Sequence, residues 1–250
     1  MKGIGEKPFI DCEPHLDIKT LEDLNLEICT GIAVSDIKAG VYGPGVDNAE
    51  RYGNFMKMKN QMLADQTEVG ERWRKMTHNQ QNIFAKLYFH LYNPSTVCYL
   101  REPAKGADPI LAYMRKGSGE AYAWTNNINN FPGLKTWLDS LIGTVFEQYG
   151  RILFFIHEHD CGLLLHRDGL KSVPHKNDFL WINPTSLKKF YVYDEDTNTR
   201  HDVLSKAAFF NDLDMHGGDV TSQMTWSLRI DGVFTQQFKE KLGIDHLTSY

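Results

Sequence analysis

The stretch LLHRDG, residues 164 to 169, places a histidine and a carboxylate two positions apart, directly after an apolar run. Side chains at positions i and i+2 of an extended strand point to the same face, so His166 and Asp168 would project together while Arg167 points away. One imidazole and one carboxylate in that arrangement can bind a single metal ion. The H-x-D pattern is common by itself, and the alternative that these residues form a charged surface turn stays open without a third ligand.

His216, in the segment DMHGGD, is the best candidate for that third ligand, because it lies near the start of the last predicted pair of strands. Two histidines and one carboxylate on one face of an ion leave three coordination positions open. This arrangement is typical of non-haem Fe(II) sites, where the open positions serve dioxygen and a co-substrate. We therefore predict that His166, Asp168 and His216 bind one Fe(II) ion.

A co-substrate site is predicted in the later segment TWSLRIDG. If 2-oxoglutarate binds the iron through its keto acid end, its far carboxylate needs a cation. Thr225, Ser227 and Arg229 share one face of a strand, so a guanidinium and a hydroxyl can bind one carboxylate there. The alternative is that Arg229 forms a cross-strand ion pair with Asp231 or Asp219.

The order H-x-D, distal histidine and then arginine resembles the pattern of the Fe(II)/2-oxoglutarate-dependent oxygenases over residues 150 to 236. The resemblance implies a double-stranded β-helix (jelly roll), iron bound by His166, Asp168 and His216, and the C5 carboxylate of 2-oxoglutarate bound by Arg229. It also implies hydroxylation with O2, because family members that halogenate lack the carboxylate that Asp168 provides.

The segment HRDGLKSVPHKNDFLWINP is similar to the prolyl and aspartyl/asparaginyl hydroxylase-like branch of that family. In this branch a second histidine with a basic neighbour follows the H-x-D pattern. The corresponding pair here is His175-Lys176, whereas the branch usually has arginine. His157 and His159 share a strand face and are either alternative metal ligands or part of the pocket wall.

After Gly150 the chain changes to short β-type runs separated by turns, which predicts a sandwich or barrel rather than a parallel sheet. The EDTNT segment is typical of a hairpin turn. The fold class expected is mainly β with supporting helices (α+β), with a jelly-roll core. The predicted strands are RILFFIHEH, CGLLLHRDG, NDFLWINP, KKFYVYD, TRHDVL, AAFFNDLDMHGG and MTWSLRIDGVF.

Two helices are predicted to support one outer face of this core. The first is THNQQNIFAKLYFHLY, with Thr77 and Gln80 as a capping box. The second begins at Pro132 and continues to Tyr149, with Gly150 as its C-cap. Short strands are expected near LEICTGIAV, a turn at GVYGPG, and long loops with one short strand at most from 94 to 130, serving either as binding elements or as a surface insertion.

We expect a single oxygenase domain over residues 1–250. Within it, residues 1–150 provide helical and loop support and a candidate lid, and residues 151–236 form the jelly-roll catalytic core. A hydrophobic share of 42% and a charged share of 24% suit an ordinary globular protein. The net charge of −5 provides no basic surface for nucleic acid.

The chain shows no secretion signal and no apolar stretch long enough to span a membrane. Four scattered cysteines (Cys12, Cys29, Cys98 and Cys161) suit reduced thiols and a cytoplasmic location. The expected substrate is a small polar molecule such as a free amino acid, and a peptide or protein side chain is the alternative. Two other classes stay open: a jelly-roll binding protein without catalysis, and a zinc hydrolase that uses the same three ligands.

Overall fold

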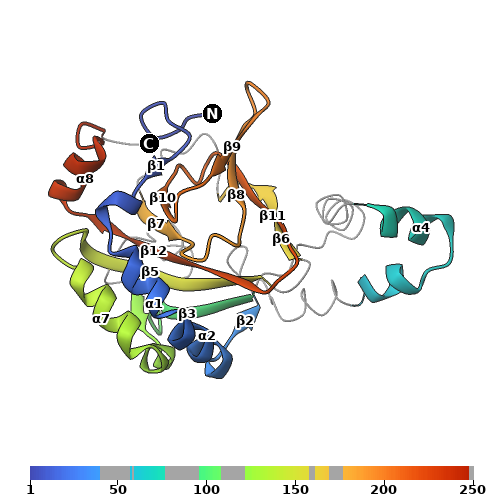
Figure 1. Ribbon diagram of the computed structural model, residues 1–250, viewed down its shortest axis with the longest axis horizontal. Coiled ribbons are helices and arrows are strands. Elements are labelled where there is room, and N and C mark those ends of the chain that lie inside the picture. Colours follow the sequence, from blue (N-terminus) through green and yellow to red (C-terminus); the bar gives the residue numbers. More distant parts are fainter. Residues whose placement is uncertain are drawn as a thin grey trace.

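The computed structural model describes residues 1–39, 57, 59–76, 96–107, 122–157, 161–168 and 177–247. Its centre consists of two antiparallel sheets that lie against each other (Figure 1). Eight strands in the second half of the chain are divided between them: β5 (Phe146–His157), β6 (Cys161–His166), β7 (Asp178–Ile182), β8 (Phe190–Asp194), β9 (Thr199–Val203), β10 (Ala207–Phe209), β11 (Met215–Thr221) and β12 (Thr225–Phe234).

The large sheet has the order β1-β10-β7-β12-β5-β3-β2, and the small sheet has the order β6-β11-β8-β9. Sequential strands therefore belong mostly to opposite sheets, which is the jelly-roll arrangement and confirms the predicted fold class. The β8–β9 hairpin, with Phe190 opposite Val203, confirms the hairpin expected at EDTNT.

Residues before the jelly roll extend the large sheet with four strands: β1 (Ile10–Asp11), β2 (Lys38–Ala39), β3 (Thr96–Pro103) and β4 (Tyr122–Trp124). The expectation of little more than loops between 94 and 130 is wrong for β3, which pairs with β5 over most of its length. Its run Val97–Leu100 is buried on both faces, and a strand covered on both sides has a continuous apolar pattern rather than an alternating one.

Three helices cover the outer face of the large sheet: α1 (Ile18–Asp23), α2 (Asn25–Val34) and α7 (Pro132–Leu141) (Figure 1). The expectation of short strands near 26–34 is wrong, since these residues form α2. Ile28, Gly31 and Ile32 follow one another at helical spacing and face the core. The indole nitrogen of Trp226 on β12 donates a hydrogen bond to Asn25 Oδ1 on α2, at 3.3 Å.

Helix α7 confirms the helix start predicted at Pro132, but the predicted end at Tyr149 is wrong. The helix ends at Leu141, and Gly143 takes a φ of +78°, a conformation that glycine adopts without a steric penalty. The chain then enters β5 at Phe146, so Tyr149 and Gly150 lie inside a strand. The jelly roll thus begins before the boundary expected at residue 151.

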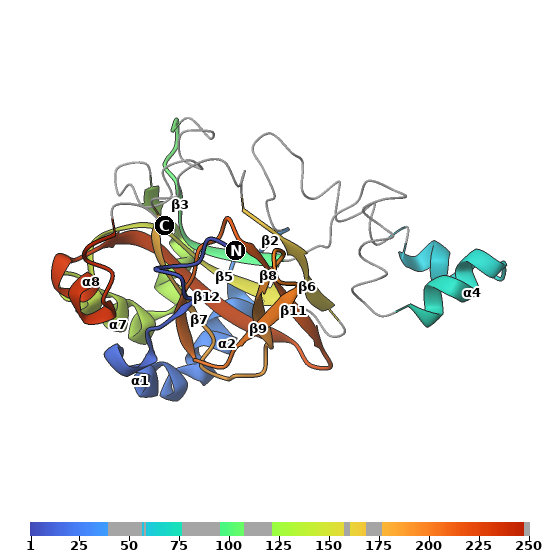
Figure 2. The ribbon, with the colours of Figure 1, turned by 90° about the horizontal axis from the view of Figure 1, so that it is seen from above.

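The remaining elements are η1 (Glu13–His15), α4 (Glu68–Lys75), η3 (Asn126–Asn130) and α8 (Gln236–Leu242). Helix α4 lies apart from the two sheets (Figure 2). The turn predicted at 40–45 and the helix predicted at 77–92 lie outside the described residues. In the part of the chain that is described, no helix has the length and apolar character needed to span a bilayer.

Strand β12 separates the helical layer from the interior of the jelly roll. Trp226 and Leu228 belong to the main core and lie opposite Ile156 and Phe154 of β5. Ser227 and Arg229 point to the other side of the sheet, between the two sheets. The site described below is built on that inner side.

Candidate metal centre

The register of the small sheet brings the two predicted histidine ligands together. His166 is the last residue of β6 and lies directly opposite His216 on β11. Their ring centroids are 4.5 Å apart. Asp168 follows β6 immediately, and its backbone N–H donates a hydrogen bond of 2.8 Å to the carbonyl oxygen of Asp212, just before β11. This bond ties the segment after β6 to the segment before β11.

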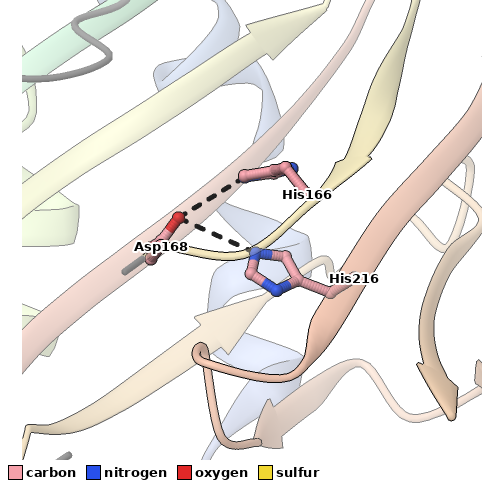
Figure 3. A group of neighbouring side chains, drawn as sticks. All are labelled: His166, Asp168 and His216. Carbon is pink, nitrogen blue, oxygen red and sulfur yellow. Dashed lines mark ion pairs between the residues drawn. The ribbon is translucent and has the colours of Figure 1, made fainter. Parts of the chain in front are cut away.

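The carboxylate of Asp168 faces both imidazoles (Figure 3). Its Oδ1 atom lies 3.4 Å from Nε2 of His166 and 3.8 Å from Nε2 of His216. One ligand atom from each of the three residues lies within 4.8 Å of the others. Atoms this close together, from two imidazoles and one carboxylate, can coordinate a single ion with small side-chain adjustments.

His216 is held in the orientation that a metal ligand needs. Its Nδ1 atom lies 2.9 Å from the carbonyl oxygen of Asp214, so Nδ1 carries the proton and Nε2 keeps the lone pair. Burial, and then the neighbouring His166, lower the pKa of His216 to about 4, which keeps the imidazole neutral. The carboxylate of Asp214 accepts hydrogen bonds from the backbone N–H groups of Lys2 and Gly3, at 2.8 and 2.7 Å.

Arg229 lies in the same pocket, with three carboxylates around its guanidinium. Nη1 pairs with Oδ2 of Asp168 at 3.0 Å, Nη2 with Oδ2 of Asp212 at 2.6 Å, and Nε with Oδ1 of Asp231 at 2.9 Å. Burial alone would lower the pKa of Arg229, but these three carboxylates raise it above its ordinary value. The ion pair with Asp231 that the sequence left open is therefore present, whereas Asp219 pairs with Arg200 instead.

Lys188 is a second buried cation in the pocket, and its residue type alone does not distinguish it from the other lysines of the chain. Its Nζ atom lies 2.7 Å from Nε2 of His157 and 3.1 Å from Oγ of Ser227. Only 4% of the residue is exposed, and burial lowers its pKa to about 7. Strand phase could not have distinguished it from the exposed Lys189, because Phe190 and Tyr191, which continue the two parities into β8, are both buried.

A pocket that is partly open to solvent connects these groups. His157 forms part of its wall, which is one of the two roles considered for it, while His159 lies outside the described residues. Trp181 lines the pocket and stacks on Phe190, with ring centroids 4.6 Å apart. The lining residues are Phe155, His157, Leu163, His166, Asp168, Trp181, Lys188, Phe190, Phe210, His216 and Arg229.

The charges of this cluster suit a divalent cation. Asp231 also pairs through Oδ2 with Nε of Arg151, at 2.8 Å. Asp168, Asp212 and Asp231 thus provide three carboxylates against the two guanidinium groups of Arg151 and Arg229, which leaves an excess negative charge among these five residues. The donor set of two imidazoles and one carboxylate likewise fits Fe(II) or a similar ion.

No protein-family model matches this sequence, and no curated protein matches it. Solved structures that are similar in shape include an oxidoreductase of the 2OG-Fe(II) oxygenase family from Burkholderia pseudomallei. It is 12% identical, with coverage of 55% of this chain and 67% of that one, and a TM-score of 0.36.

Two prolyl hydroxylases are similar at the same level. The prolyl-4-hydroxylase of Pseudomonas putida is 9% identical, with coverage of 87% and 97% and a TM-score of 0.33. The prolyl hydroxylase of Trichoplax adhaerens, solved with a hypoxia inducible factor peptide, is 10% identical, with coverage of 96% and 100% and a TM-score of 0.34. Since these scores are low, the function proposed next depends on the site itself.

Proposed function

We propose that this chain is a non-haem Fe(II)/2-oxoglutarate-dependent dioxygenase that hydroxylates an unactivated C–H bond. The observation that carries the proposal is the convergence of His166, Asp168 and His216 between the two sheets of a jelly roll. These three residues would hold Fe(II). The bound ion, with 2-oxoglutarate and O2 as co-substrates, would supply the oxidation of the C–H bond.

The protein's own residues prepare this site in two ways. Neutral His216, fixed through its Nδ1 proton, presents Nε2 towards Asp168, which presents one carboxylate oxygen to both histidines. Apolar side chains form much of the remaining wall and would limit the access of water to the reacting groups. They are Phe155, Leu163, Trp181, Phe190 and Phe210.

The substrate that we propose is a small polar molecule, such as a free amino acid. The buried charged side chains that line the pocket favour a polar ligand. The side chain of a peptide or protein is the alternative. A screen for succinate release, with Fe(II), ascorbate and sets of amino acids and short peptides, separates the two. Release stimulated by peptides alone would replace the first substrate class with the second.

An anaerobic titration with Fe(II) and 2-oxoglutarate tests the reaction class. An oxygenase site should develop a weak visible charge-transfer band when both are bound. His216→Ala should abolish it, whereas His201→Ala, a change on β9 of the same sheet, should not. A zinc hydrolase would give no such band and would hydrolyse a substrate with Zn²⁺ alone, and a binding protein would release no succinate under any condition.

A cytoplasmic location remains part of the proposal. It is supported by the free thiols of Cys12, Cys29 and Cys98 among the described residues.

A further inference from the structure

We propose that Lys188, rather than Arg229, binds the far carboxylate of the dicarboxylate co-substrate, and that Arg229 positions Asp168 for the metal. This inference rests on the proposed function, since it requires 2-oxoglutarate to enter the pocket lined by both cations. It reverses the assignment of Arg229 that the residue order predicts and retains the predicted role of Ser227.

The contacts of Arg229 leave little capacity for another anion. Each side of its planar guanidinium already pairs with a carboxylate, from Asp168, Asp212 or Asp231. Its Cζ atom also lies 4.0 Å from the ring centroid of Phe179, so that one face of the group is covered. A bound dicarboxylate would have to displace one of these carboxylates, which would break a charge pair in a region of low dielectric.

Lys188 has the properties that an anion receptor needs. Its amine contacts an imidazole nitrogen of His157 and the hydroxyl of Ser227, and no carboxylate pairs with it in the part of the chain that the structure describes. A buried ammonium without a counter-ion is unfavourable, so an entering carboxylate would be bound strongly.

Two hydroxyl groups on the same face of β12 are candidate donors for the same ligand. Ser227 is fully buried and already lies 3.1 Å from the Lys188 amine. Thr225 has the same strand parity as Ser227 on β12, and its buried Oγ1 atom has no hydrogen-bond partner among the described residues. An ammonium and the hydroxyl beside it can satisfy the two oxygens of one carboxylate.

Arg229 has a different task, which follows from the division of the Asp168 carboxylate. Oδ2 of Asp168 binds the guanidinium, and Oδ1 faces the two histidines. Asp212 and Asp231, both fully buried, hold Arg229 from the other side. Arg229 is therefore a positioning residue: it sets which oxygen of Asp168 a metal ion would meet.

The test compares two keto acids that differ only in the far carboxylate. Titration calorimetry of the Mn(II)-loaded protein with 2-oxoglutarate and with 2-oxobutyrate gives a ratio of affinities. Lys188→Met should reduce that ratio on the order of tenfold to hundredfold, the range for a hydrogen bond to a charged group. The affinity for Mn(II) should stay within about twofold, which also shows that the variant is folded. Lys189→Met is the matched control, since Lys189 is the exposed neighbour.

Arg229→Lys should show the opposite pattern. Mn(II) affinity should fall by roughly tenfold or more, as for other residues that orient a ligand, while the ratio between the two keto acids stays near that of the unchanged protein. Arg200→Lys is the control, because Arg200 pairs with carboxylates at the surface. If Arg229→Lys does not fold, Lys188→Met and Lys188→Gln still test the role of Lys188, because each should lower the ratio of the affinities for 2-oxoglutarate and 2-oxobutyrate.

The inference would be overturned if Arg229→Lys lost the preference for 2-oxoglutarate over 2-oxobutyrate while Lys188→Met kept it. Arg229 would then be the residue that binds the far carboxylate. A different result affects the proposed function itself: if the unchanged protein binds Mn(II) but neither keto acid, the oxygenase assignment fails and this inference falls with it.

Discussion

Oδ2 of Asp168 lies 3.0 Å from Nη1 of Arg229, on the opposite side of the carboxylate from the two histidines. This ion pair connects the candidate metal centre to a group of buried charges beside the pocket. Arg229, Asp212 and Asp231 are each at most 4% exposed. A change anywhere in this chain of contacts should therefore be detected at the metal site.

Removal of a histidine ligand should weaken metal binding severely. We expect His166→Ala and His216→Ala each to lower Mn(II) affinity at least about hundredfold, because one of three protein ligands is lost. Consistent with this, excess Mn(II) should raise the melting temperature of the unchanged protein and leave that of either variant the same. Thermal unfolding with and without the ion measures the effect, and an equal stabilisation of His216→Ala would contradict the assigned ligand set.

Asp212→Asn should lower the free energy of unfolding of the protein. The substitution removes one fully buried carboxylate from Arg229, so we expect a loss of about 3 kcal/mol in the free energy of unfolding, measured by urea denaturation. Asp202→Asn breaks a surface pair with Arg200 and should cost less than about 1 kcal/mol. Equal losses in the two variants would show that burial does not strengthen the network around Arg229.

Binding of 2-oxoglutarate should weaken as the pH rises above neutrality. Burial lowers the pKa of Lys188 to about 7, and a bound carboxylate would raise it again. Below pH 7 the amine is already charged; above it, binding must take up a proton, so affinity should fall up to about tenfold per pH unit.

Calorimetry from about pH 6 to about pH 9 measures this dependence. The same titration with 2-oxobutyrate is the control, because it shares the contributions of the other titratable and charged groups but has no far carboxylate. Equal slopes for the two keto acids would contradict the prediction. The groups around Lys188 in the pocket are His157, His166, Asp168, His216 and Arg229.

Gly31→Ala should destabilise the protein although alanine favours helices. An added Cβ would overlap the ring of Phe131 and lie 2.8 Å from the carbonyl oxygen of Asn130. We expect the overlap to cost about 3 kcal/mol, which leaves a net loss of about 2 kcal/mol after the gain in helix propensity of about 1 kcal/mol. Thr30→Ala, on the exposed side of the same helix, should be neutral or slightly stabilising in urea denaturation. A stabilised Gly31→Ala protein would mean that α2 packs less closely on η3 than described.

The strands of the jelly roll could be predicted from sequence because turn residues separate each apolar run, and these cues are local. The errors occurred where local cues conflict. The apolar stripe that begins in α7 continues through Phe146 and Tyr149, so helical spacing alone gives no reason to end the helix at Leu141. The reversal depends on Gly143, whose left-handed backbone is visible only in the fold.

The histidines and the carboxylate of the site could be proposed from order and spacing, because the small sheet places the ends of β6 and β11 side by side. The partners of Arg229 could not be proposed in the same way. Asp212 lies in a turn between strands, and nothing in its neighbourhood distinguishes it from other acidic turn residues. Burial determines its importance, and burial depends on how the two sheets pack.

The two-sided character of β12 should be visible in a saturation-mutagenesis experiment that reads cellular abundance and ligand binding separately. Substitutions at apolar positions should lower the cellular abundance of the protein, since these side chains belong to the main core. Examples are Trp226, Leu228 and Ile230. Substitutions of Ser227, which lies between them, should leave the cellular abundance of the protein unchanged but should weaken the binding of the ligand. The tolerance profile along this strand would then alternate between the two readouts from one residue to the next.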